Sequence, residues 1–197
     1  MKTKVLVVTG GIGSGKTMVA SMFKDLGVVI YNADNEAKLL MNTSPVLKEK
    51  ITALFGVNAY ENNLLNTSYI SRLVFSNKSM LVKLNSIVHP AVKIHFKEWL
   101  KFQNSPYVVK EVAILFEIGA ENAYNFILTV TASKGVRIKR LVERDGKSVQ
   151  EIELIMSNQL DSSQQIKNSD FVINNTDLEK TRKEVYNIHN EIIKLCR

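Results

Sequence analysis

The chain has 197 residues, of which 45% are hydrophobic and 23% charged, and its formal net charge is +7. This composition is typical of one soluble globular domain, and no apolar run approaches the roughly 20 residues that a membrane-spanning helix requires. The single cysteine, Cys196, excludes an internal disulfide and a zinc site built from cysteines.

The first elements predicted along the chain are a strand, a glycine-rich loop and a helix. The apolar run VLVV precedes GGIGSGKT at 10–17, and apolar residues then recur at helical spacing up to Gly27, a residue that favours a helix end. The apolar stretch VVIY at 28–31 predicts a strand buried in a parallel sheet. NADNEAKLLM then predicts a helix that ends near Pro45.

Residues 45 to about 103 contain no convincing strand, and their apolar residues are spaced as in helices. Pro90 interrupts the last of these helices, where it predicts a kink or a restart. The remaining chain alternates strands and helices, which implies a mostly parallel sheet. Its strands are predicted in 107–117 (with a loop), 126–132 and 171–174, and its helices at about 134–145, 148–160 and 177–196.

GGIGSGKT matches the phosphate-binding loop template, Gly-x-x-x-x-Gly-Lys-Ser/Thr. Its glycines let consecutive backbone N–H groups point at phosphate oxygens, at the positive end of the following helix. Lys16 is expected to reach the outer phosphates of ATP, and the Thr17 hydroxyl is expected to bind Mg²⁺. The residues predicted to hold ATP here are Gly11, Ile12, Gly13, Ser14, Gly15, Lys16 and Thr17.

Two carboxylates follow predicted strands. Asp34 ends the triplet Asn32-Ala33-Asp34, and Glu111 lies near the end of a later strand. Ligands collect at the carboxyl ends of parallel strands. Asp34 is therefore either a base for an attacking hydroxyl, a metal partner through water, or a helix cap. Glu111 is either a water-mediated magnesium partner or an exposed charge.

A predicted helix carries Arg137, Arg140 and Arg144 at i, i+3 and i+7, within a narrow arc of its surface. Such a stripe can neutralise charge on a phosphoryl group in transfer. Taken alone, a solvated basic face, partly paired with Glu143 and Asp145, is the favoured interpretation.

Several motifs, in order along nearly the whole chain, resemble those of the dephospho-CoA kinase family of P-loop kinases. They are TGGIGSGKT with VASMFKDLG, NAD with NEAK, LNSIVHPAV, AILFE, RLVERDG and NQLDSSQQIKNSDFVINN. The resemblance implies that ATP phosphorylates the ribose 3′-hydroxyl of dephospho-CoA, giving CoA and ADP in the last step of coenzyme A synthesis.

The resemblance also implies residue roles. Asp34 would be the base, while Lys16 and Arg140 would stabilise the transferred phosphoryl group. Arg144 would close over ATP and Asn175 would lie near the adenine. Thr17 would ligate Mg²⁺, and Asp34, His89 and Glu117 would contact the acceptor.

The fold expected is α/β, a three-layer α/β/α P-loop kinase fold with a mostly parallel central sheet. A single domain is expected, with a core of about 1–34 and 106–197, a helical acceptor-binding insertion of about 35–105, and a helical lid of about 134–165. We expect a cytoplasmic monomer or small homo-oligomer that uses ATP, Mg²⁺ and dephospho-CoA, with no nucleic acid or membrane partner.

Four positions depart from the family pattern. Asn32 replaces an aspartate, Ala113 replaces a proline, and Ser162 and Gln165 stand where many members carry basic residues. The alternatives are another small-molecule P-loop kinase acting on a nucleoside monophosphate-like acceptor, a GTPase-type switch, and a nucleic-acid-binding protein. The only Asn-Lys pair, at 77–78, is not followed by the guanine-reading pattern Asn-Lys-x-Asp.

Overall fold

The computed structural model describes residues 2–196, apart from the side chains of residues 75 and 76, and the chain forms two compact units. The first unit comprises Met1–Asn32 with Gln103–Arg197, and the second comprises Ala33–Phe102. Within residues 2–196, no helix combines the length and the apolar character needed to cross a membrane.

The first unit is built on a five-stranded sheet of order β2-β5-β1-β6-β7, in which every neighbouring pair is parallel. The central strand β1 is buried along VLVVT, as its continuous apolar sequence requires of a strand covered on both faces. This confirms the predicted α/β fold with a parallel sheet. The strands are β1 (Lys4–Thr9), β2 (Ile30–Asn32), β5 (Tyr107–Glu111), β6 (Phe126–Thr131) and β7 (Phe171–Asn174).

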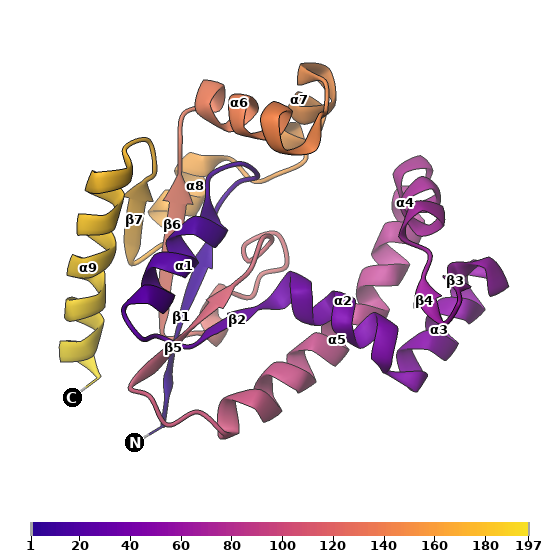
Figure 1. The fold of residues 1–197 in the computed structure, drawn as a ribbon, viewed down its shortest axis with the longest axis horizontal. Coiled ribbons are helices and arrows are strands. Elements are labelled where there is room, and N and C mark those ends of the chain that lie inside the picture. The colour runs from indigo at the N-terminus through magenta and orange to yellow at the C-terminus, as the bar shows by residue number, and fades with distance from the viewer. Residues whose placement is uncertain (1, 197) are drawn as a thin grey trace. The chain divides into compact units, whose positions relative to one another are not determined.

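Helices cover both faces of this sheet (Figure 1). The helices α1 and α9 pack on one face, where Phe23, Val185 and Ile192 join the sheet residues of the main core. The short helix α8 packs against β6 on the other face, where Thr129 and Ser169 share a hydrogen bond of 2.6 Å. The helices are α1 (Lys16–Asp25), α6 (Lys134–Asp145), α7 (Val149–Ser157), α8 (Ser162–Lys167) and α9 (Leu178–Leu195), with a 3-10 turn η2 (Glu121–Ala123).

The second unit is mainly helical, but it also contains a small hairpin. Asn62 and Asn63 adopt positive φ, which gives the tight turn that joins its two-residue strands. The prediction that this region contains no strand is wrong here, because strands this short show no alternation. The elements are α2 (Ala33–Thr43), α3 (Pro45–Phe55), η1 (Val57–Ala59), β3 (Tyr60–Glu61), β4 (Leu64–Leu65), α4 (Thr67–Ser76) and α5 (Lys78–Lys101).

Helix α5 runs through Pro90 without a restart. The proline removes one backbone donor, but Val88, Val92 and Phe96 on either side of it are buried. The apolar packing of the surrounding turns therefore maintains the helix, and the predicted restart is wrong.

We expect Phe23→Ala to lower the free energy of unfolding by about 3–5 kcal/mol, because its fully buried ring fills the core between α1 and the sheet. The control Leu154→Ala, at a side chain 67% exposed on α7, should change it by less than about 0.5 kcal/mol. Urea unfolding measures both. Equal losses in the two variants would contradict this placement of the core.

Candidate nucleotide-binding site

The loop between β1 and α1 ends at Gly15, which adopts the left-handed conformation with φ 95°. Helix α1 begins at Lys16, and none of the described side chains caps its N-terminus. The N–H groups of a first helical turn have no partner within the helix, and the helix dipole favours negative charge there. The local structure is therefore that of an anion-binding site, as the template predicts.

Some of the loop's polar groups are bonded within the protein. The Lys16 ammonium donates to the carbonyl groups of Gly10 (2.8 Å) and Gly11 (3.3 Å). The N–H of Ser14 donates to the Gly11 carbonyl, and the N–H of Ile12 donates to Gln159 Oε1 at 2.8 Å. Of the loop residues predicted to hold ATP, Ile12 and Ser14 thus use their backbone donors to shape the loop.

Glu111 connects the ends of three neighbouring segments. Its Oε1 accepts a hydrogen bond from the Thr17 hydroxyl at 2.6 Å, and its Oε2 accepts one from Asn32 Nδ2 at 2.6 Å. The parallel register sets Val8 and Asn32 opposite Glu111, so the strand ends converge there. Only 8% of Glu111 is exposed, and the alternative of an exposed charge is therefore wrong.

The same oxygen cluster fits Mg²⁺, which prefers hydroxyl, carboxylate and phosphate oxygens and retains several waters. Because the Thr17 proton is donated to Glu111, the lone pairs of the Thr17 oxygen remain directed elsewhere. Thr17 would ligate the ion directly and Glu111 would orient Thr17 or act through water.

Asn175 and Arg140 both donate hydrogen bonds to the Ser14 carbonyl of the loop. The Asn175 side chain, only 1% exposed, donates to the Ser14 carbonyl at 2.8 Å and accepts from the Thr181 hydroxyl at 3.3 Å. Arg140 donates to the carbonyl groups of Ser14 (3.2 Å) and Asn175 (2.9 Å). A side chain on Gly15 would place its Cβ 2.1 Å from Asn175 Nδ2. Asn175 thus holds the loop, and its contact with adenine stays a prediction.

The other two arginines of the stripe differ from each other. Arg137 donates from Nε to the Ile12 carbonyl at 2.8 Å, and burial lowers the pKa of its guanidinium. Arg144 pairs instead with the neighbouring Asp145 at 2.7 and 2.9 Å, and this hydrogen bonding raises the pKa of Arg144. The alternative of a solvated, paired basic face therefore fits Arg144, while Arg137 and Arg140 contact the loop.

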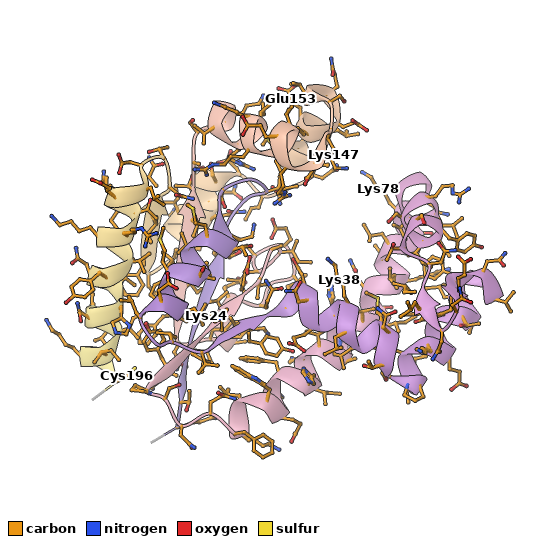
Figure 2. All side chains as sticks on the ribbon, in the orientation of Figure 1. Lys24, Lys38, Lys78, Lys147, Glu153 and Cys196 are labelled. Carbon is orange, nitrogen blue, oxygen red and sulfur yellow. The ribbon has the colours of Figure 1, made fainter. Side chains whose placement is uncertain are left out.

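Helices α6 and α7 of the region predicted as a lid contact each other. Leu141 of α6 and Ile152 of α7 are fully buried, and Lys134 pairs with Glu153 at 2.6 Å. Glu153 lies on α7 in Figure 2, and Lys147 lies in the turn that joins α6 to α7. The Lys134–Glu153 pair thus links the two helices at the surface.

Gln159, two residues beyond the end of α7, and its neighbour Leu160 were not predicted as part of the site. Glu117 accepts from the Leu160 N–H at 3.2 Å, and Gln165 donates to the Leu160 carbonyl at 3.4 Å. Gln165 is only 2% exposed. Where many family members carry a basic residue, this chain therefore has a buried, neutral amide that hydrogen-bonds to the Leu160 backbone. Gln159 falls within the helix predicted at about 148–160, but α7 ends at Ser157, and helical spacing gives no signal for a loop contact beyond that end.

Asp34 and His89 belong to the second unit. Asp34 lies in the first turn of α2, which begins at Ala33, so it does not occupy the capping position before the helix. His89 is half-buried in α5, and this burial lowers the pKa of its imidazole, which favours the neutral ring at pH 7.

The chain is similar to known proteins along most of its length. The family model described as dephospho-CoA kinase matches residues 4–180. The dephospho-CoA kinase of Porphyromonas gingivalis is 36% identical over 143 residues, which cover 73% of this chain and 71% of that protein. That of Fusobacterium nucleatum is 34% identical over 187 residues, which cover 94% and 96%. A Thermus thermophilus protein of known structure aligns with a TM-score of 0.87 and 27% identity over 97% of this chain and 98% of its own. The chain belongs to the dephospho-CoA kinase family.

Proposed function

We propose that the chain phosphorylates the ribose 3′-hydroxyl of dephospho-CoA with ATP, using Asp34 as the base and Lys16 and Arg140 at the transferred phosphoryl group. Its family makes it an ATP-dependent kinase with dephospho-CoA kinase function. The observation that carries the proposal is the family match over residues 4–180, which spans both compact units.

The donor half of this reaction is built from the loop and the first turn of α1. Lys16 and Arg140 both contact loop carbonyl groups, so each cation lies at the edge of the anion-binding turn. In this proposal Lys16 and Arg140 exchange these neutral carbonyl acceptors for phosphate oxygens when ATP binds. Charge-assisted bonds to phosphate are stronger than bonds to carbonyl groups, which favours that exchange when ATP binds. Arg144 closes over ATP and Asn175 lies near its adenine in this proposal.

Thr17 holds Mg²⁺ in this proposal, with Glu111 behind it. The ion, when bound, neutralises charge on the phosphate oxygens of ATP. The protein fixes the Thr17 hydroxyl through its 2.6 Å hydrogen bond to Glu111, and Asn32 fixes the other carboxylate oxygen. Both restraints orient the Thr17 oxygen before any ligand binds.

In this proposal the acceptor is bound by the helical insertion of about 35–105, which largely coincides with the second unit, and by Glu117. Asp34 is the one carboxylate of the Asn-Ala-Asp triplet, so it receives the hydroxyl proton in the transfer step. His89, neutral at pH 7, would donate or accept a hydrogen bond to the acceptor. We further infer a cytoplasmic enzyme, a monomer or small homo-oligomer, whose lid spans about 134–165.

The function is tested with a coupled assay of ADP release, using dephospho-CoA against a panel of nucleoside monophosphates. We expect dephospho-CoA to give the highest kcat/KM. A higher kcat/KM with AMP or another monophosphate would overturn the assignment of the acceptor.

Asp34→Asn should lower kcat by about 10²–10⁴-fold, the contribution typical of a general base, because an amide does not accept the hydroxyl proton. The affinity for ATP should stay within about twofold, because the base acts in the chemical step. Glu36→Gln, in the same helical turn, is the control. Turnover near the unsubstituted rate in Asp34→Asn would exclude Asp34 as the base.

Glu111→Gln should raise the free Mg²⁺ concentration needed for half-maximal activity by about 10- to 100-fold, the usual cost of losing an outer-shell partner. The neutral amide weakens the restraint on Thr17 and removes a buried negative charge beside the ion. Titration of activity against free Mg²⁺ at saturating ATP measures this shift. An unchanged Mg²⁺ dependence would contradict the role given to Glu111.

A further inference from the structure

Arg137 and Gln159 both form hydrogen bonds to the backbone of Ile12, in the middle of the phosphate loop. Arg137 Nε donates to the Ile12 carbonyl at 2.8 Å, and the Ile12 N–H donates to Gln159 Oε1 at 2.8 Å. Arg137 Nη2 also approaches Gln159 Oε1, at 3.4 Å, so the two side chains contact each other as well as the loop. We call these three groups, Arg137, Gln159 and the Ile12 backbone, the Ile12 clamp.

The clamp fixes two consecutive peptide groups. The N–H of Ile12 belongs to the peptide that joins it to Gly11, and its carbonyl belongs to the peptide that joins it to Gly13. Holding both sets the φ and ψ angles of Ile12, which turn the chain toward the start of α1. The clamp therefore determines the direction of the loop N–H groups that follow it.

The clamp and helix α6 leave no room for a side chain at the neighbouring positions Gly11 and Gly13. A Cβ on Gly11 would lie 2.4 Å from Arg137 Nη2, so the guanidinium lies against the bare backbone. A Cβ on Gly13, which has φ 77°, would lie 2.9 Å from the Arg137 carbonyl and 3.0 Å from Leu141 Cδ1. Helix α6 thus lies against the loop tip through the side chains of Arg137 and Leu141 and through the Arg137 carbonyl.

Gln159 is anchored in turn by its own neighbours. Its N–H donates to the Met156 carbonyl at the end of α7. Both polar backbone groups of Leu160, the next residue, are bonded, to Glu117 and to the buried Gln165. The backbone on both sides of the Gln159 side chain is therefore hydrogen-bonded to the rest of the protein, which positions its Oε1 against the loop.

We infer that Arg137 and Gln159 are positioning residues that preorganise the phosphate loop for ATP through the Ile12 backbone. Ordering a loop costs free energy when it occurs on binding, and a loop ordered in advance binds its ligand more tightly. Because the triphosphate occupies the loop in both the ground state and the transition state, losing the clamp weakens ATP binding and leaves kcat nearly unchanged. This inference rests on the proposed use of ATP and is independent of the acceptor.

The test is a set of ATP dissociation constants measured by calorimetry on the full-length protein without acceptor. Gln159→Met keeps the side-chain length and removes the acceptor, and Arg137→Met removes the donor. Each should raise the Kd for ATP about tenfold, on the order of one lost hydrogen bond. Gln159→Glu retains the accepting oxygen and should stay within about threefold of the unsubstituted protein.

The double variant distinguishes a shared clamp from two separate contacts. Since both residues act on Ile12, Arg137→Met with Gln159→Met should raise the Kd little more than either change alone. Independent contacts would multiply to about 100-fold, and that result would overturn the inference. The matched controls Lys139→Met and Gln164→Met, at exposed positions of α6 and α8, should leave the Kd unchanged.

A purely structural role would have a different signature. It would lower the melting temperature and the yield of active enzyme, and therefore the apparent kcat, while the Kd for ATP stayed constant. That pattern would also overturn the inference. Should Gln159→Met not fold, Gln159→Asn, which retains the amide but shortens its reach, must show the same rise in Kd. A different preferred acceptor in the substrate panel would overturn the proposed function and leave these affinities untouched.

Discussion

The backbone carbonyl groups of the phosphate loop impose the constraint on which the rest of the site depends. A loop that turns its N–H groups toward a phosphate turns its carbonyl groups the other way, where each needs a donor. Here the carbonyl groups from Gly10 to Ser14 receive hydrogen bonds from side chains. The donors are Lys16, Arg137, Arg140 and Asn175.

This arrangement explains why two arginines of the stripe lie on the inner side of α6. Arg137 and Arg140 satisfy loop carbonyl groups with neutral partners, and no described carboxylate lies within ion-pair distance of either side chain. The positive charge of Arg140, which contacts the Ser14 carbonyl, is therefore not cancelled by a carboxylate. Arg144, one turn further along, pairs with Asp145 and contributes much less field near the loop.

The departure at Asn32 also has a local physical meaning. Its amide donates to Glu111 at 2.6 Å, a distance at which a second carboxylate would place two negative oxygens in contact. An amide at this position therefore holds the Glu111 carboxylate in place without a cation. The magnesium proposal consequently depends on Thr17 and Glu111, while Asn32 is a supporting residue.

The sequence alone determined the strand-loop-helix unit, the parallel sheet and the locations of Lys16, Thr17 and Glu111, because glycine spacing and continuous apolar runs are local signals. It did not identify Gln159, the buried position of Gln165, or the support that Asn175 gives to Ser14. Those roles arise between residues as far apart as Ser14 and Asn175, which only the folded sheet brings together. It also could not decide between a solvated and a loop-binding arginine stripe, because helical spacing defines a face and only tertiary packing determines what that face meets.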